Sequence, residues 1–120
     1  MSGTLGLFSL ADAIESIAGE NSSGRYAKTL LKSPRLRVVL TAMEAGIELH
    51  EHTAPGPITI QPIRGRFTVT VENDDYVLGP ESVLAIDANV RHSVRAHEDG
   101  VFLLTIVWSG EAAHVTDQGK

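Results

Sequence analysis

The hydrophobic and polar positions divide the chain into one helical segment followed by a series of strands. In residues 9–18, SLADAIESIA, the apolar residues Leu10, Ile14 and Ile17 recur at helical spacing, and Ser9 stands where an N-cap belongs. The segment GENSSG then breaks the pattern. Alternating or apolar runs between turn signals predict strands at about 26–32, 36–43, 46–52, 58–63, 66–72, 75–78, 82–87, 91–97 and 101–108. Many short strands at nearly even spacing predict an all-β sandwich or barrel.

The stretch GIELHEH, residues 46–52, carries two of the five histidines. Because side chains alternate between the two faces of a strand, Ile47 and Leu49 share one face, and Glu48, His50 and His52 share the other. In a simple two-layer protein the apolar face would pack inward and the histidines would point to water. In a barrel whose outer surface is also covered, the histidines would point into the interior.

The segment VFLLTIVW, residues 101–108, is apolar on both faces, which indicates that the outside of the sheet is covered as well as the inside. Ile58 and Ile60, like Ile47 and Leu49, would then lie on an outer face beneath the helix or a partner subunit. We therefore predict a homodimer, the commonest symmetric assembly. The histidine face would line a partly polar interior, and a barrel of about eight strands holds one small ligand.

A third histidine, His92, opens the strand expected at 91–97. His92 shares a face with Val94 and Ala96, whose apolar character indicates that this face points inward. His50, His52 and His92 would then form a set of three imidazoles. Such a set holds a divalent transition metal (Fe, Ni, Mn, Zn or Cu) and leaves coordination positions open for a substrate.

Two spaced motifs make the chain similar to a small single-domain cupin of the cupin-2, RmlC-like type, a double-stranded β-helix or jelly-roll barrel. The first cupin motif, G-x5-H-x-H-x3–4-E-x6-G, would correspond to Gly46, His50, His52 and Gly65. The second, G-x5-P-x-G-x2-H-x3-N, would correspond to Gly79, Asp87, Asn89 and His92, with Asp87 and Asn89 where Pro and Gly are usual. The resemblance implies a single domain over 1–120. Its core would span about 36–108, preceded by a helix and strand at 9–32 and followed by a polar tail at 109–120.

The first motif departs from the cupin pattern in its spacing and at its acidic ligand. Gly46 and His50 are two residues closer than the pattern requires, and the glutamate position, counted back from Gly65, falls on Ile58. Gln61 is the nearest polar candidate. A bulge after PGP would turn Gln61 into the pocket, where its amide would hydrogen-bond a substrate or a metal-bound water.

Composition excludes several other classes of protein. The length of 120 residues fits one domain, and the absence of cysteine excludes thiolate chemistry. The net charge of −5 and the lack of a basic cluster argue against a nucleic-acid partner. No apolar run approaches the ~20 residues that span a bilayer, and the N-terminus lacks a secretory signal pattern, so we expect no membrane partner and a cytoplasmic location.

Two functions remain open. The resemblance implies a metal-binding cupin of unassigned activity, dioxygenase-like or isomerase-like, that acts on a small organic substrate with the metal on His50, His52 and His92. We take this metal-binding function as the main expectation, and the alternative is a non-catalytic binding or sensing module, in which the histidines hydrogen-bond a small-molecule ligand in a metal-free pocket. Three neutral imidazoles without a carboxylate leave the metal's charge uncompensated, which weakens metal retention.

Overall fold

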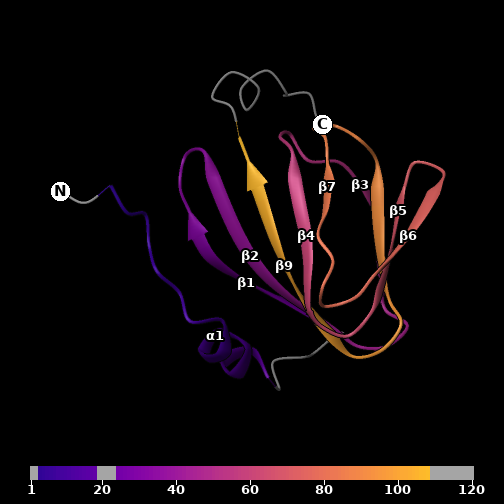
Figure 1. Ribbon diagram of the computed structural model, residues 1–120, viewed down its shortest axis with the longest axis horizontal. Helices are drawn as coiled ribbons and strands as arrows, with labels where there is room; N and C mark the ends of the chain where they lie inside the picture. The colour runs from indigo at the N-terminus through magenta and orange to yellow at the C-terminus, as the bar shows by residue number, and fades with distance from the viewer. Residues whose placement is uncertain (1–2, 19–23, 109–120) are drawn as a thin grey trace.

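The computed structural model describes residues 3–18 and 24–108, so the polar tail expected at 109–120 lies outside the described residues. A helix, α1 (Leu10–Ile17), precedes the strands β1 (Arg25–Lys32), β2 (Leu36–Met43), β3 (Glu48–His52), β4 (Ile58–Arg64), β5 (Phe67–Val71), β6 (Asp74–Leu78), β7 (Leu84–Ile86), β8 (His92–Ala96) and β9 (Gly100–Val107). Within this part of the chain the strands form two antiparallel sheets, in the orders β1-β2-β9-β4-β7 and β3-β8-β5-β6. The two sheets face each other (Figure 1), which confirms the all-β jelly-roll prediction.

The N-terminal helix begins at its predicted cap. The Ser9 hydroxyl oxygen accepts a hydrogen bond from the Asp12 backbone N–H at 3.1 Å, which satisfies one of the free donors of the first turn. Asp12 also places a negative charge near the positive end of the helix dipole. The helix therefore starts where the sequence indicates, within one residue of the expected boundary.

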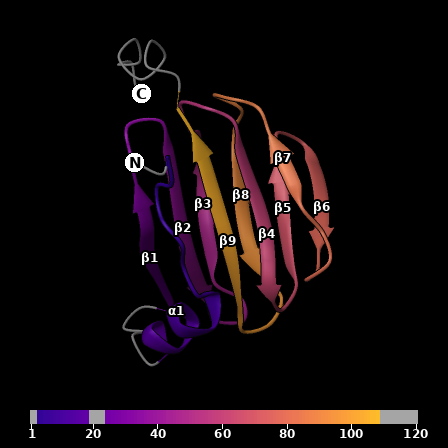
Figure 2. The same ribbon diagram turned by 60° about the vertical axis from the view of Figure 1, so that its left-hand side comes forward.

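The helix covers the outer face of the larger sheet near one end of β1 and β2 (Figure 2). Its buried residues include Ile14 and Ile17 as predicted, and Ala13 takes the deeper position expected for Leu10, which is half-buried. They pack against a cluster on the sheet that comprises Leu30, Leu40, Ala42, Ile63, Val101 and Leu103. The prediction that the strand at 101–108 is covered on both faces is thus confirmed at Val101 and Leu103, whereas Val107 near its other end is 44% exposed.

The space between the sheets is filled by apolar side chains. The buried core consists of Met43, Ile58, Ile60, Phe67, Val69, Leu78, Ile86, Val94, Ala96 and Phe102. The Phe67 and Phe102 rings meet edge to face, with centroids 5.2 Å apart, and truncation of either buried ring to alanine costs about 3–5 kcal/mol. The interior is therefore mainly apolar, in contrast to the partly polar lumen expected from the sequence.

Several residues expected on an outer face lie inside. Ile58 and Ile60 are buried in the core, and Leu49 packs against it. Their faces follow from the pairing of β4 with β9, in which Ile60 lies beside Leu104 on the inner side of the sheet. The surfaces on which the homodimer prediction rested therefore contribute to the core, and that prediction requires another surface.

Two turns depend on unusual backbone conformations. Gly65, between β4 and β5, has a φ of 83°, and a Cβ atom there would lie 2.8 Å from the Asp99 carbonyl oxygen. Asn89, before β8, has a φ of 62°, a left-handed backbone that suits the position where the cupin motif has glycine and that Asn tolerates. The Asn89 N–H donates to the Ala54 carbonyl at 2.8 Å, so this turn is tied to the loop that follows β3.

Candidate functional site

A β-bulge in β3 decides which histidines enter the barrel. Leu49 pairs with Val94, but His52 pairs with His92, so β3 contains one residue more than β8 between these two pairs. Leu49 and His52 therefore lie on the same inner side of the sheet, although strict alternation would separate them. The sequence prediction that His50 and His52 share one face is corrected by this extra residue.

His52 and His92 meet at one end of the barrel interior. Their ring centroids are 4.3 Å apart and the rings meet edge to face. His92 is buried beside Val94 and Ala96, as the sequence predicted, whereas His52 is exposed. The pair thus joins an enclosed imidazole to one that solvent or a ligand can reach.

Both rings are oriented by the backbone. His52 Nδ1 lies 2.7 Å from the His50 carbonyl oxygen, and His92 Nδ1 lies 3.0 Å from the Val90 carbonyl oxygen. Because a carbonyl only accepts hydrogen bonds, each Nδ1 carries the proton and donates it. In the neutral state each Nε2 therefore presents a lone pair, which can accept a hydrogen bond or bind a metal ion.

Burial lowers the pKa of His92, and the neighbouring His52 lowers it further, while the hydrogen bond to Val90 partly opposes both effects. Burial acts because a charged imidazolium loses its hydration between the two sheets. At neutral pH His92 is therefore the uncharged tautomer described above. Its Nε2 lone pair remains available to a ligand.

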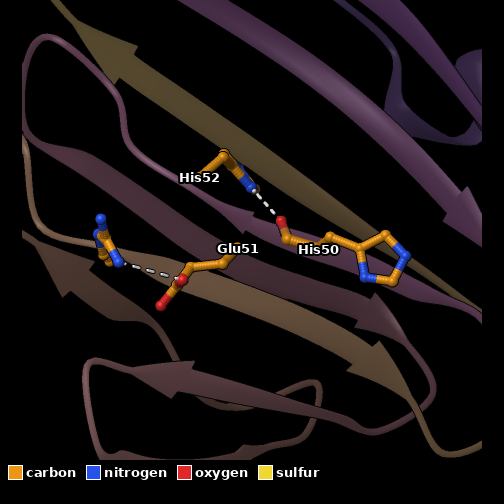
Figure 3. A network of polar contacts seen from close by, with 4 residues as sticks. His50, Glu51 and His52 are labelled. Carbon is orange, nitrogen blue, oxygen red and sulfur yellow. Dashed lines mark hydrogen bonds and ion pairs between the residues drawn. The ribbon is translucent and has the colours of Figure 1, made fainter. Parts of the chain in front are cut away.

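His50 and Gln61 lie elsewhere. Figure 3 shows the His50 ring directed away from His52, and His50 lines a surface hollow with Arg25, Gly46 and Glu48. Gln61 is exposed between the buried Ile60 and Pro62, so it lies on the outer face of β4, and no bulge turns it into the barrel. The structure therefore brings together two of the three predicted imidazoles and leaves the predicted amide outside.

The positions of a cupin metal set are recognisable once the register is corrected. The first motif requires five residues between its glycine and its first histidine, and from Gly46 this count reaches His52 rather than His50. The second histidine position then falls on Ala54 and the glutamate position on Ile58, with the motif closing on Gly65 at the expected spacing. The structure agrees with this register, because Ile58 is buried in the core and Ala54 packs against it.

The residues present do not fit the metal set of the motif. Two of its four ligand positions hold aliphatic side chains, Ala54 and Ile58, which have no donor atom. Structural and catalytic metal sites use at least three protein ligands as a rule. Among residues 3–18 and 24–108 no group of three or more histidine or acidic side chains is placed to hold a metal ion. The count back from Gly65 already placed the glutamate position on Ile58, and the spacing from Gly46 could have revealed the replacement at Ala54 as well.

The arrangement of strands is that of known cupins. The chain is similar to a cupin superfamily protein from Desulfitobacterium hafniense, with 20% identity and a TM-score of 0.69 over 71% of this chain and 78% of that one. It is also similar to the Cnp3 cupin domain of Schizosaccharomyces pombe, with 16% identity and a TM-score of 0.71 over 82% and 75%. A third similar structure is the cupin_2 domain of an XRE family transcriptional regulator from Enterobacter cloacae, with 16% identity and a TM-score of 0.64 over 72% and 99%.

The chain therefore has the cupin fold, a double-stranded β-helix. The fold is also similar to that of an RmlC-like cupin from Shewanella frigidimarina, with 20% identity and a TM-score of 0.67 over 73% of this chain and 79% of that one. No protein-family model matches the sequence, and no curated protein matches it. Among the described residues, no helix has the length and apolar character needed to cross a bilayer.

Proposed function

We propose that this chain is a non-catalytic binding module, which takes a small organic ligand at the end of its cupin barrel where His52 and His92 meet, without a resident metal. The observation that carries the proposal is the pair of aliphatic side chains, Ala54 and Ile58, at two ligand positions of the motif. Ile58 is 3% exposed and packs among apolar neighbours. Ile58 therefore stabilises the core, because an aliphatic side chain contributes to folding through its burial and has no lone pair with which to bind a metal ion.

The histidine pair gives such a module a polar contact for its ligand. Two neutral imidazoles, both held by backbone carbonyls, accept hydrogen bonds through Nε2. Hydrogen bonds made beside the buried His92 are stronger than in water because the surroundings are less polar. The cupin_2 domain of the XRE family regulator is a similar fold within a regulatory protein, which supports a binding role for a domain of this type.

A second function, metal-dependent activity, is favoured by one observation. Metal-binding histidines usually donate the other ring N–H to a carbonyl or carboxylate, as His52 and His92 do here. These two residues would hold the metal, which would supply Lewis-acid chemistry, and a substrate would have to provide further ligands. His50 would not take part while its ring points away from the pair.

Metal titration separates the two functions. The untagged protein is titrated with ZnCl₂ and NiCl₂, and its melting temperature is followed beside that of the His52→Ala/His92→Ala variant. We expect the same small response in both proteins, since any remaining effect would come from surface histidines. A rise in the wild-type melting temperature that the variant loses would contradict the proposal and favour the metal-dependent function.

A further inference from the structure

The barrel is open along one side, where each sheet ends. β1 is the terminal strand of the larger sheet and β3 the terminal strand of the smaller one. Ala27, on the inner face of β1, pairs with the buried Thr41 yet is itself exposed. The larger sheet therefore extends past the smaller one, with β1 at the margin of the molecule (Figure 2). Its inner face stays uncovered there.

A cavity of about 360 Å³ occupies this opening. Its lining consists of Arg25, Tyr26, Ala27, Val39, Thr41, Leu49 and Leu104. Val39 and Leu104 pair across β2 and β9 on the inner side of the sheet, and Leu49 faces them from β3. The volume lies within the range of small-molecule sites, and the walls are mainly apolar as in such sites. We call this space the edge cavity.

Arg25 supplies a positive charge at the rim of the edge cavity. It also lines the adjoining hollow of about 400 Å³ that contains His50 and Glu48. Within the described part of the chain no hydrogen bond or ion pair engages the Arg25 guanidinium, whereas Arg91 contacts Glu51 at 3.5 Å. Glu48 places a negative charge in the adjoining hollow, so an anion is expected on the side of Arg25 that faces the apolar walls.

We propose that the edge cavity binds an organic monocarboxylate with an apolar tail. The carboxylate pairs with the Arg25 guanidinium, whose fork of N–H donors matches the two carboxylate oxygens. The tail lies against Val39, Leu49 and Leu104 and leaves water. This inference rests on the proposed binding function and names its ligand class. It also moves the main contact from the histidine pair to the open side of the barrel.

The test uses octanoate as probe and octan-1-ol as its uncharged counterpart, each titrated into the ¹⁵N-labelled wild-type protein by NMR. We expect both probes to shift backbone signals of Ala27, Val39 and Leu104, with octanoate binding more tightly. Arg25→Gln is expected to weaken octanoate at least about tenfold and to leave octan-1-ol unchanged, since charge-assisted hydrogen bonds contribute that much. Arg25→Lys restores only part of the affinity because an ammonium lacks the planar fork.

Two control variants make the outcome specific. Lys28→Gln removes the same charge from β1, but Lys28 pairs with Leu40 on the opposite face, so octanoate affinity should not change. Ala27→Phe fills the cavity from an exposed position and should weaken both probes without unfolding the protein. The inference is overturned if neither probe binds, if Arg25→Gln has no effect, or if Lys28→Gln has an equal one. Octanoate shifts centred on His52 and His92 would overturn this site while leaving the binding function intact.

Discussion

Donor groups introduced at the two aliphatic motif positions test whether the corrected register identifies the ligand positions of a cupin metal site. In Ala54→His/Ile58→Glu, all four positions of the first and second motifs carry donor groups. Without metal we expect a loss of about 3–5 kcal/mol in the free energy of unfolding, because Ile58 is 3% exposed and an unpaired carboxylate would take its place. Pairing of that carboxylate with a metal ion removes most of this penalty.

The size of the recovery follows from mass action. At a free metal concentration of 1,000 times Kd, binding to the folded state adds about 4 kcal/mol. For a domain of this size each kcal/mol moves Tm by about 4 °C, so ZnCl₂ or NiCl₂ should raise Tm by about 15 °C. Differential scanning calorimetry with and without metal measures the shift, and competition with a chelator gives Kd.

Two further variants keep the test decisive. Ala54→His/Ile58→Gln has side chains of the same size but no carboxylate, so its metal-dependent shift should be much smaller. Ala54→His alone leaves the core intact and adds a third imidazole, which should give measurable metal binding even if the double variant folds poorly. The corrected register would be refuted if none of these variants bound metal more tightly than wild type.

Three further predictions concern pH, a turn and assembly. Because burial lowers the pKa of His92, the unfolded chain takes up a proton more readily than the folded one, so stability should fall as pH drops below about 6.5; thermal melts from pH 8 to 5 should show a weaker slope for His92→Asn than for wild type, and equal slopes would contradict this. Asn89→Gly should change stability little, whereas Asn89→Val should cost about 1–2 kcal/mol, since φ is 62° there; urea denaturation measures both, and equal values would refute the turn assignment. The homodimer prediction now depends on the N-terminal segment, where Leu5 and Leu7 are 62% and 95% exposed; light scattering should give a dimer that Leu5→Ser/Leu7→Ser abolishes and Val77→Ser/Val83→Ser does not, and a monomeric wild type would contradict it.

Most of the fold could be predicted from the sequence, because the helix cap, the turns and the alternation within each strand are set by neighbouring residues. Ser9 marks the start of the helix, and turn segments such as RG and HEDG separate strands whose alternation is plain. The structure reproduces these strands with small differences at their ends. Asn89 was identifiable for the same reason, since a short polar side chain in a tight turn tolerates a positive φ.

The site was harder to predict because one extra residue in a strand moves every side chain after it to the opposite face of the sheet. Alternation placed His50 beside His52, but the bulge in β3 turns His52 inward and leaves His50 outside. Nothing in GIELHEH itself marks a bulge. A regular strand and a strand with one extra residue after Leu49 both place apolar residues on one face and polar residues on the other for part of its length. The spacing from Gly46 did contain the answer, because it identifies His52, Ala54 and Ile58 as the motif positions.

The helix covers part of the outer face, as predicted, but the residues beneath it differ from those expected. The helix packs on Leu40 and Val101, whereas Ile58 and Ile60 point into the barrel. Both faces of β4 carry apolar residues, with Ile63 on the side of the helix, so alternation alone does not tell inside from outside. The pairing of β4 between β7 and β9 decides it, and that pairing is set by contacts distant in sequence.

Metal content shows whether the barrel holds a metal ion. The protein is purified without a tag or chelator, incubated with iron, nickel, manganese, zinc or copper, desalted, and measured by inductively coupled plasma mass spectrometry beside His52→Ala/His92→Ala. We expect far less than one metal ion per chain and no difference between the two proteins. About one ion per wild-type chain, lost in the variant, would contradict it and would show that two histidines suffice to hold a metal in this barrel.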